Sequence, residues 1–172
     1  MSDWRERVSG PAREDFEALM SMVLPAAEST LQRFGKLQPF GAAVTVEGDV
    51  IRINADQRLG QDPQPRDVIR SLYSGARAAA FARRAMAVVQ TGRSGGTDAM
   101  RIDMEHSDGH SVAVIVPFTI SRFKKTYTRG TMVAGAAVCH IWNELPERID
   151  LRTGREVPAS EQSAAPAQHI DI

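Results

Sequence analysis

The sequence predicts an α+β domain in which two long helices pack against a five-stranded antiparallel sheet. Two stretches of the chain carry apolar residues at the three-to-four spacing of a helix. Two other stretches alternate apolar and polar residues on either side of a glycine-containing turn, which is typical of a β-hairpin. A further apolar stretch around residue 135 predicts a fifth strand, so the expected element order is α-β-β-α-β-β-β.

The composition of the chain argues against several classes of protein. Its 172 residues fit one domain, and its 21 basic and 21 acidic side chains leave no net charge to attract nucleic acid or an anionic membrane. Cys139 is the only cysteine, so no disulfide forms within the chain. No apolar run reaches the roughly 18 residues of a spanning helix, and no signal-peptide core follows Met1. We therefore expect a cytoplasmic protein, and the excess of arginine over lysine indicates a bacterial source.

The first predicted helix runs from Pro11 to Phe34, after a flexible N-terminus at residues 1–10. Gly35 follows the last apolar position and is expected to end the helix. Pro25 lies inside the pattern and should kink or restart the helix, because proline removes a backbone hydrogen bond. The predicted buried face consists of Phe16, Leu19, Met20, Val23, Ala27, Leu31 and Phe34.

The first predicted hairpin spans residues 40–55. Gly48-Asp49 suits a two-residue type II′ turn, which takes glycine at its first position. This turn places every apolar pair on one side, as a half-buried ribbon requires. The predicted pairs are Val46 with Ile51, Val44 with Ile53 and Ala42 with Ala55.

The second predicted helix begins after Asp62 or Gln64, where the following proline occupies the first helical position. It is expected to run to about Thr91 and to end at Gly92. Residues 93–97, Arg-Ser-Gly-Gly-Thr, predict a flexible connection. The predicted inner face consists of Val68, Ile69, Leu72, Tyr73, Ala76, Ala79, Ala80 and Ala87.

The second predicted hairpin spans residues 100–118. A two-residue turn would set Asp103 and Glu105 opposite apolar residues, whereas a three-residue turn at 107–109 pairs apolar residues with each other. The second register is favoured, and Gly109 then takes the left-handed position of a bulged turn. Asp103 and Glu105 are expected to face solvent. The predicted pairs are Met100 with Val116, Ile102 with Val114 and Met104 with Val112.

The predicted fifth strand lies between Thr126 and Trp142. It is apolar on both faces from Met132 onward, which favours a central strand that is covered front and back. A third helix is the alternative interpretation, because the stretch is rich in alanine. The single domain would then comprise residues 11–145, and the polar residues 146–172 predict a largely disordered tail.

The order of elements over residues 12–142 resembles the profilin-like and roadblock-like group of small domains. In that group the last strand lies at the middle of the sheet, which agrees with the two-sided apolar stretch at Met132–Trp142. Three short segments, Gln38-Pro-Phe-Gly-Ala, Glu105-His-Ser-Asp-Gly and Val116-Pro-Phe, are also similar to small bacterial proteins of unknown function. The resemblance implies a fold and no mechanism, because one fold serves many functions.

The histidines are the strongest candidates for chemistry. In the favoured register His106 stands opposite His110, and two side chains with Cβ atoms about 5 Å apart could share a metal ion. A zinc site needs three or four protein ligands, so a solvated pair is the simpler interpretation and we predict no metal. Cys139 and His140 are adjacent on a strand and point to opposite faces, which excludes a nucleophile–base pair. The sequence therefore predicts no catalytic residue and no cofactor.

The expected function is a non-enzymatic protein-interaction module that forms a homodimer, and another protein is the alternative partner. Two helices and five strands leave apolar surface on one face or at one edge of the sheet, and this surface must find a partner. One alternative is a small-ligand-binding or enzymatic domain with a pocket between helix and sheet. Another is an immunity-type or regulatory protein that binds one partner. The candidate interaction residues are Met132, Val138, Trp142, Arg122, Lys124 and Lys125.

The basic residues in that set lie beside aromatic ones, a combination that can bind single-stranded nucleic acid. In a chain without net charge, a few basic residues in one loop are typical of a solvated turn. We therefore expect neither nucleic acid nor a membrane as a partner.

Overall fold

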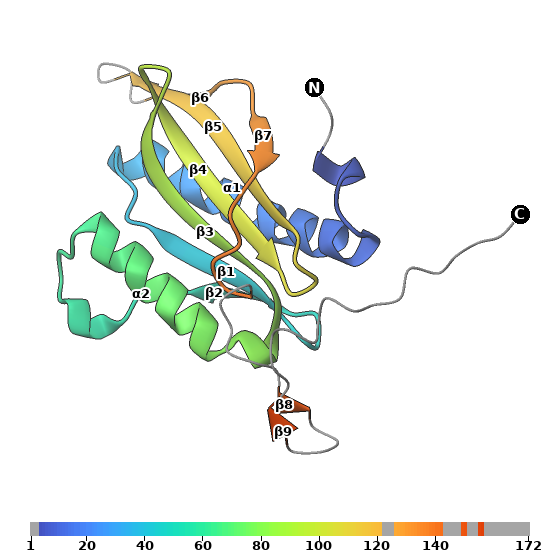
Figure 1. The fold of residues 1–172 in the computed structure, drawn as a ribbon. Helices are drawn as coiled ribbons and strands as arrows, with labels where there is room; N and C mark the ends of the chain where they lie inside the picture. The colour runs from blue at the N-terminus through green and yellow to red at the C-terminus, as the bar shows by residue number, and fades with distance from the viewer. Residues whose placement is uncertain (1–3, 122–125, 143–148, 151–154, 157–172) are drawn as a thin grey trace, which may run out of the picture.

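The computed structural model describes residues 4–121, 126–142, 149–150 and 155–156 of the chain. Within these residues two helices lie on opposite faces of an antiparallel sheet (Figure 1). Figure 1 views the sheet from the side of the second helix, with the first helix behind it. The predicted α+β class is confirmed, but the sheet has seven strands where the sequence predicts five.

The elements are listed here by their bounds. The helices are α1 (Gly10–Phe34) and α2 (Pro65–Ala78), with short 3₁₀ turns at Trp4–Glu6, Gln57–Leu59 and Ala80–Ala82. The strands of the main sheet are β1 (Phe40–Thr45), β2 (Val50–Ile53), β3 (Arg83–Ser94), β4 (Thr97–His106), β5 (Ser111–Ser121), β6 (Thr126–Arg129) and β7 (Val133–Ala136). Their order is β2-β1-β3-β4-β5-β6, and β7 also pairs with β5. The short strands β8 (Ile149–Asp150) and β9 (Arg155–Glu156) form a separate pair.

Helix α1 agrees with the predicted helix at both ends. The Ser9 hydroxyl caps its start by accepting the Ala12 N–H, and Gly35 ends it with φ 70°. Pro25 lies inside one uninterrupted helix, so the expected restart does not occur. Phe34 is 62% exposed, although the pattern places it on the buried face. The buried side consists of Ala12, Asp15, Phe16, Leu19, Val23, Ala27 and Leu31.

The first hairpin, β1–β2, has a different register from the predicted one. Its turn is the three-residue loop 46–48, in which Gly48 has φ 100° and the flanking Thr45 N–H donates to the Asp49 carbonyl at 2.9 Å. The predicted register assumes that one face of β1 meets solvent, whereas α1 covers one face and α2 the other. With both faces buried, apolar pairing on one side does not select the register. The observed pairs are Gly41 with Ile53, Ala42 with Arg52, Ala43 with Ile51 and Val44 with Val50.

The second predicted helix is too long, because its second half is strand β3. Helix α2 runs only from Pro65 to Ala78. Residues 85–89 lie in the middle of the sheet, with alternate side chains in the cores under α1 and α2. An alanine-rich apolar run fits a helix or a two-sided strand, and burial on both faces favours the strand. The predicted flexible connection at 93–97 is the tight turn between β3 and β4, where two adjacent glycines have positive φ.

The second hairpin, β4–β5, has the predicted register. Gly109 in the loop 107–109 has φ 94°, and the His106 N–H donates to the His110 carbonyl at 2.9 Å. The prediction is confirmed because apolar and charged residues alternate from Met100 to Glu105 in β4, so only one register brings the apolar side chains together. The observed pairs include Met100 with Val116, Ile102 with Val114 and Met104 with Val112.

The last strands lie at the edge of the sheet and not at its middle. Both β6 and β7 pair with the outer side of β5, and between them the Gly130 N–H donates to the Pro117 carbonyl at 2.8 Å. Residues 137–142, which we call the crossing segment, have no regular structure and run over the α2 side of the sheet (Figure 1). The predicted central strand at 126–142 and its helical alternative are therefore wrong. In the profilin-like and roadblock-like group the last strand lies at the middle of the sheet. Here β3 lies beside β1 at the middle and, among the described strands, β7 pairs only with β5, so that arrangement is not found.

Two hydrophobic cores hold the helices on the sheet. The core under α1 includes Trp4, which packs on Phe16 with ring centroids 5.9 Å apart. The smaller core under α2 includes Ile141 of the crossing segment. Helix α2 packs mainly on β1 and β3, which leaves the β4–β5 part of this face to the crossing segment and a pocket. None of the described helices is long and apolar enough to cross a membrane.

Candidate functional site

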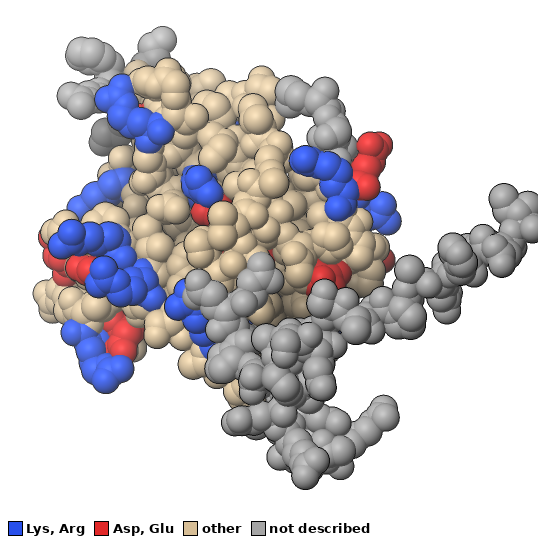
Figure 2. Space-filling view, viewed as in Figure 1, with Lys and Arg blue, Asp and Glu red and all other residues tan. Residues whose placement is uncertain are grey.

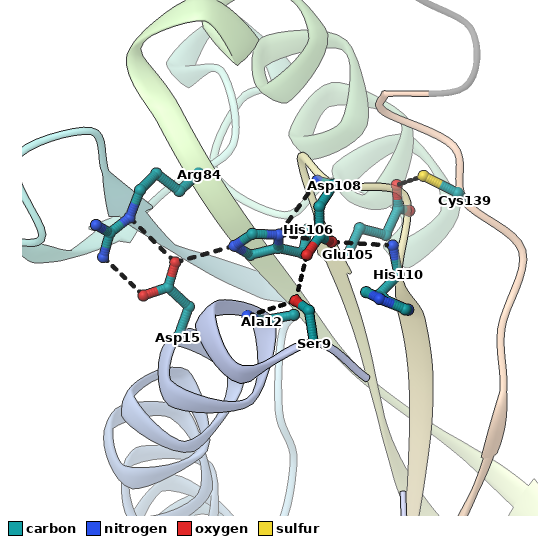
Figure 3. A network of polar contacts seen from close by, with 9 residues as sticks. All are labelled: Ser9, Ala12, Asp15, Arg84, Glu105, His106, Asp108, His110 and Cys139. Carbon is teal, nitrogen blue, oxygen red and sulfur yellow. Dashed lines mark hydrogen bonds and ion pairs between the residues drawn. The ribbon is translucent and has the colours of Figure 1, made fainter. Parts of the chain in front are cut away.

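The two histidines of the second hairpin flank its turn, where the His106 N–H donates to the His110 carbonyl, but the ring of His106 contacts other residues. His106 is buried, and its ring lies between two carboxylates (Figure 3). Its Nε2 atom is 3.2 Å from Asp15 Oδ2, and its Nδ1 atom is 2.7 Å from Asp108 Oδ1. His110 reaches Asp108 through its backbone N–H. Within the described part of the chain, no three His, Cys, Asp or Glu side chains are placed so that they could hold one metal ion.

A chain of polar contacts continues from His106 on both sides (Figure 3). Asp15 of α1 accepts two hydrogen bonds from Arg84 of β3, at 2.7 and 3.1 Å. Asp108 accepts the hydroxyl of Ser9, the residue that caps α1. Partial burial raises the pKa of Asp108, but the hydrogen bonds from Ser9 and His106 outweigh it and hold that pKa below its usual value. The network therefore ties the start of α1 to β3 and to the β4–β5 turn.

The arrangement of these side chains does not suit nucleophilic catalysis. A nucleophilic serine must donate to the histidine that removes its proton. The Ser9 hydroxyl instead donates to Asp108 and accepts the Ala12 N–H. The His106 ring packs edge-on against Phe16, with centroids 6.2 Å apart, and His106 is 5% exposed. The network thus joins the buried Asp15 and His106 to the more exposed Arg84, Asp108 and Ser9, and its removal is expected to cost stability.

Glu105 holds the crossing segment on the opposite face of β4. Its Oε2 atom accepts the Cys139 thiol at 3.2 Å and the backbone N–H groups of His140 and Ile141, both at 2.8 Å. Its Oε1 atom is buried without a hydrogen-bond partner among the described residues. The expectation that Asp103 and Glu105 face solvent is wrong: both are buried, because α2 and the crossing segment cover this face. Cys139 is buried.

A pocket of about 530 Å³, which we call the α2 pocket, opens between α2, the crossing segment and the sheet. Its floor includes one row across three strands, in which Gln90 pairs with Arg101 and Arg101 pairs with Ile115. Tyr73 of α2 and His140 of the crossing segment line its sides, with ring centroids 5.3 Å apart. Figure 2 shows this side of the molecule, where charged side chains gather over α2 and around the rim while the centre is largely uncharged.

An ion pair lies in the α2 pocket. The Arg101 Nε atom donates to both carboxylate oxygens of Asp103, at 2.9 and 2.8 Å, and this hydrogen bonding raises the pKa of Arg101. Sequence analysis places Asp103 in solvent and Tyr73 on an apolar helix face, so it misses the pocket. The one sign of the pocket in the sequence is the row of charged residues that alternates with apolar ones in β4. This row indicates a site only once it is known that α2 and the crossing segment cover that face of the sheet.

The predicted interaction residues fall in different places. Met132, which precedes β7 in the sequence, is 41% exposed, and Val138, which follows it, is 68% exposed. Trp142 is partly buried against the core under α2. Arg122, Lys124 and Lys125 lie outside the described residues, as does most of the predicted tail at 146–172.

No family model, curated protein or solved structure matches the chain. Function is therefore inferred from two surfaces of the chain itself, the edge strand β7 and the α2 pocket.

Proposed function

We propose that the chain is a non-enzymatic protein-interaction module that forms a homodimer through the edge strand β7. The observation that carries the proposal is the open, apolar character of this edge. Strand β7 pairs with β5 on one side, and among the described residues no strand pairs with its other side. Met132, Val133 and Val138, in and beside β7, are 41%, 47% and 68% exposed.

An edge strand presents backbone N–H and C=O groups that can pair with another chain. Proteins usually protect such edges with a charged residue, a proline or a bulge. Strand β7 has the sequence Val-Ala-Gly-Ala, which contains neither a charge nor a proline. The opposite edge, β2, carries Arg52, whose guanidinium lies 4.5 Å from the centre of the Phe40 ring. Strand β7 is thus the less protected edge of the sheet.

A second copy of the chain is the partner that this geometry favours. Two copies of β7 can pair antiparallel about a two-fold axis, and each copy then offers the same edge and the same apolar side chains to the other. Because the chain has no net charge, no overall repulsion opposes this association.

Light scattering coupled to size-exclusion chromatography tests the proposal. Val133→Lys places a charge on the edge of β7, and Val46→Lys is the matched control, because Val46 is 49% exposed but lies in the β1–β2 loop. At micromolar concentration, the unchanged protein and the control should have twice the monomer mass of 18.8 kDa, and Val133→Lys should have the monomer mass. An 18.8 kDa species of the unchanged protein throughout, or a dimer of Val133→Lys, would contradict the proposal.

A further inference from the structure

The α2 pocket collects polar groups whose hydrogen-bonding capacity the fold does not use. Tyr73, Gln90 and His140 line the pocket, and the hydroxyl, the amide and the ring nitrogens of these three side chains have no hydrogen-bond partner among the described residues. Folded proteins satisfy most of their sheltered polar groups, so several open donors and acceptors around one pocket indicate a site for a polar ligand.

Arg101 supplies the charge of this site. Its Nε atom is used by Asp103, whose side chain is 9% exposed, while the side chain of Arg101 is 50% exposed. Neither Nη nitrogen of Arg101 has a partner within the described residues, so the outer half of the guanidinium is available. Two parallel N–H groups of a guanidinium match the two oxygens of a carboxylate. The ion pair with Asp103 holds the guanidinium in place and thereby prepares it for a ligand.

The remaining groups favour a ligand with one negative charge and an apolar body. Arg93 and Arg101 line the pocket with Asp103, so the arginine and carboxylate side chains of the pocket have an excess of one positive charge. Burial, together with the carboxylates of Asp103 and Glu105, raises the pKa of Tyr73, so its hydroxyl stays protonated at neutral pH and can donate. Ile69 and Ile115 contribute apolar surface to the same pocket.

We propose that the α2 pocket binds a small organic carboxylate, whose anionic group is held by Arg101 and Tyr73 and whose apolar body lies against Ile69 and Ile115. The volume of about 530 Å³ is in the range of small-molecule sites, roughly 300–1,000 Å³. No residue of β7 lines this pocket, although Val133 of β7 pairs with Ile115, which does. The charged and polar groups of the site come from α2, β3, β4 and the crossing segment, so the proposal does not rest on the homodimer.

Titration of the isotope-labelled protein with benzoate, followed by NMR, tests the proposal. Saturable shifts are expected at Tyr73, Arg101 and His140. Benzamide has the same ring without the charge and should bind at least about tenfold more weakly, because a charge-assisted pair is roughly twice as strong as a neutral hydrogen bond. Inorganic phosphate serves as the second probe and should bind more weakly than benzoate.

Two variants and one control identify the groups involved. Tyr73→Phe removes a hydroxyl that has no partner in the described structure, so it should leave the unfolding midpoint unchanged and weaken benzoate binding several-fold. Arg101→Gln should abolish saturable binding. Arg70→Gln is the control: it removes an exposed arginine of α2, the helix of Tyr73, that does not line the pocket, and this variant should bind benzoate normally.

Three results would overturn the proposal. The first is the absence of saturable shifts with benzoate, and the second is benzoate affinity that is unchanged in Tyr73→Phe, a variant expected to fold normally. The third is a phosphate or benzamide affinity equal to or above that of benzoate, which would show that the pocket does not select a carboxylate.

Discussion

Replacing Glu105 with alanine removes the acceptor that fixes residues 139–141 to the sheet. The part-buried N–H of His140, the buried N–H of Ile141 and the Cys139 thiol then lose a carboxylate oxygen at 2.8 to 3.2 Å. A buried donor without a partner costs about 1 to 3 kcal/mol. The lower part of this range applies here, because the N–H groups of His140 and Ile141 can donate to water once the crossing segment is released from the sheet. We therefore expect the free energy of unfolding to fall by about 2 to 3 kcal/mol for the two N–H groups together.

Urea unfolding measures this loss. With a slope of about 2 kcal/mol per molar, typical of a small domain, the midpoint should fall by about 1 to 1.5 M. Asp98→Ala is the matched control, because Asp98 is an exposed acid on the same strand and should change stability by less than about 0.5 kcal/mol. A thiol reagent should also label Cys139, which is 8% exposed, faster in Glu105→Ala. Equal midpoints for the two variants, together with an unchanged labelling rate, would refute the role of Glu105.

Two further predictions concern the turns. Gly48 has φ 100°, so Gly48→Val should lower the free energy of unfolding by about 1 kcal/mol or more, and an unchanged thermal midpoint would show that this conformation is not required. The folded-state pKa of Asp108 is below its ordinary value of 3.8, so the ionised group stabilises the fold above that value and loses this contribution as pH falls through the lower folded pKa. Unfolding curves of the unchanged protein and Asp108→Asn should therefore differ most near neutral pH and converge below about pH 4, whereas a difference independent of pH would contradict the interpretation.

The sequence predicts an element well where one of its faces carries apolar side chains and the other carries polar or charged ones. Along β4 the charged residues alternate with apolar ones, and this pattern together with Gly109 determines both the register and the turn of the second hairpin. Strands β1 and β3 are buried on both faces, so their sequences lose the period of two. For this reason the predicted register of the first hairpin is wrong and residues 83–91 resemble the end of a helix.

The candidate sites depend on contacts between distant segments, which no local pattern records. Glu105 and Cys139 meet over a separation of 34 residues, and Arg84 and Asp15 meet over 69. The α2 pocket combines one helix, three strands and a segment without regular structure. For the edge strand β7, the sequence does show the apolar character of Met132 and Val138. The position of β7 at the edge of the sheet, and not at its middle, follows only from the topology.

Hydrogen exchange at residues 132–138, measured at several protein concentrations, tests the proposed homodimer most directly. If β7 pairs with a second copy, its amides gain protection as the concentration rises through the dimerisation range, because backbone groups at the open edge then form hydrogen bonds. Val133→Lys should lack this increase and Val46→Lys should retain it. Protection of β7 that is the same at every concentration, in a sample whose exchange elsewhere shows an intact fold, would contradict the account.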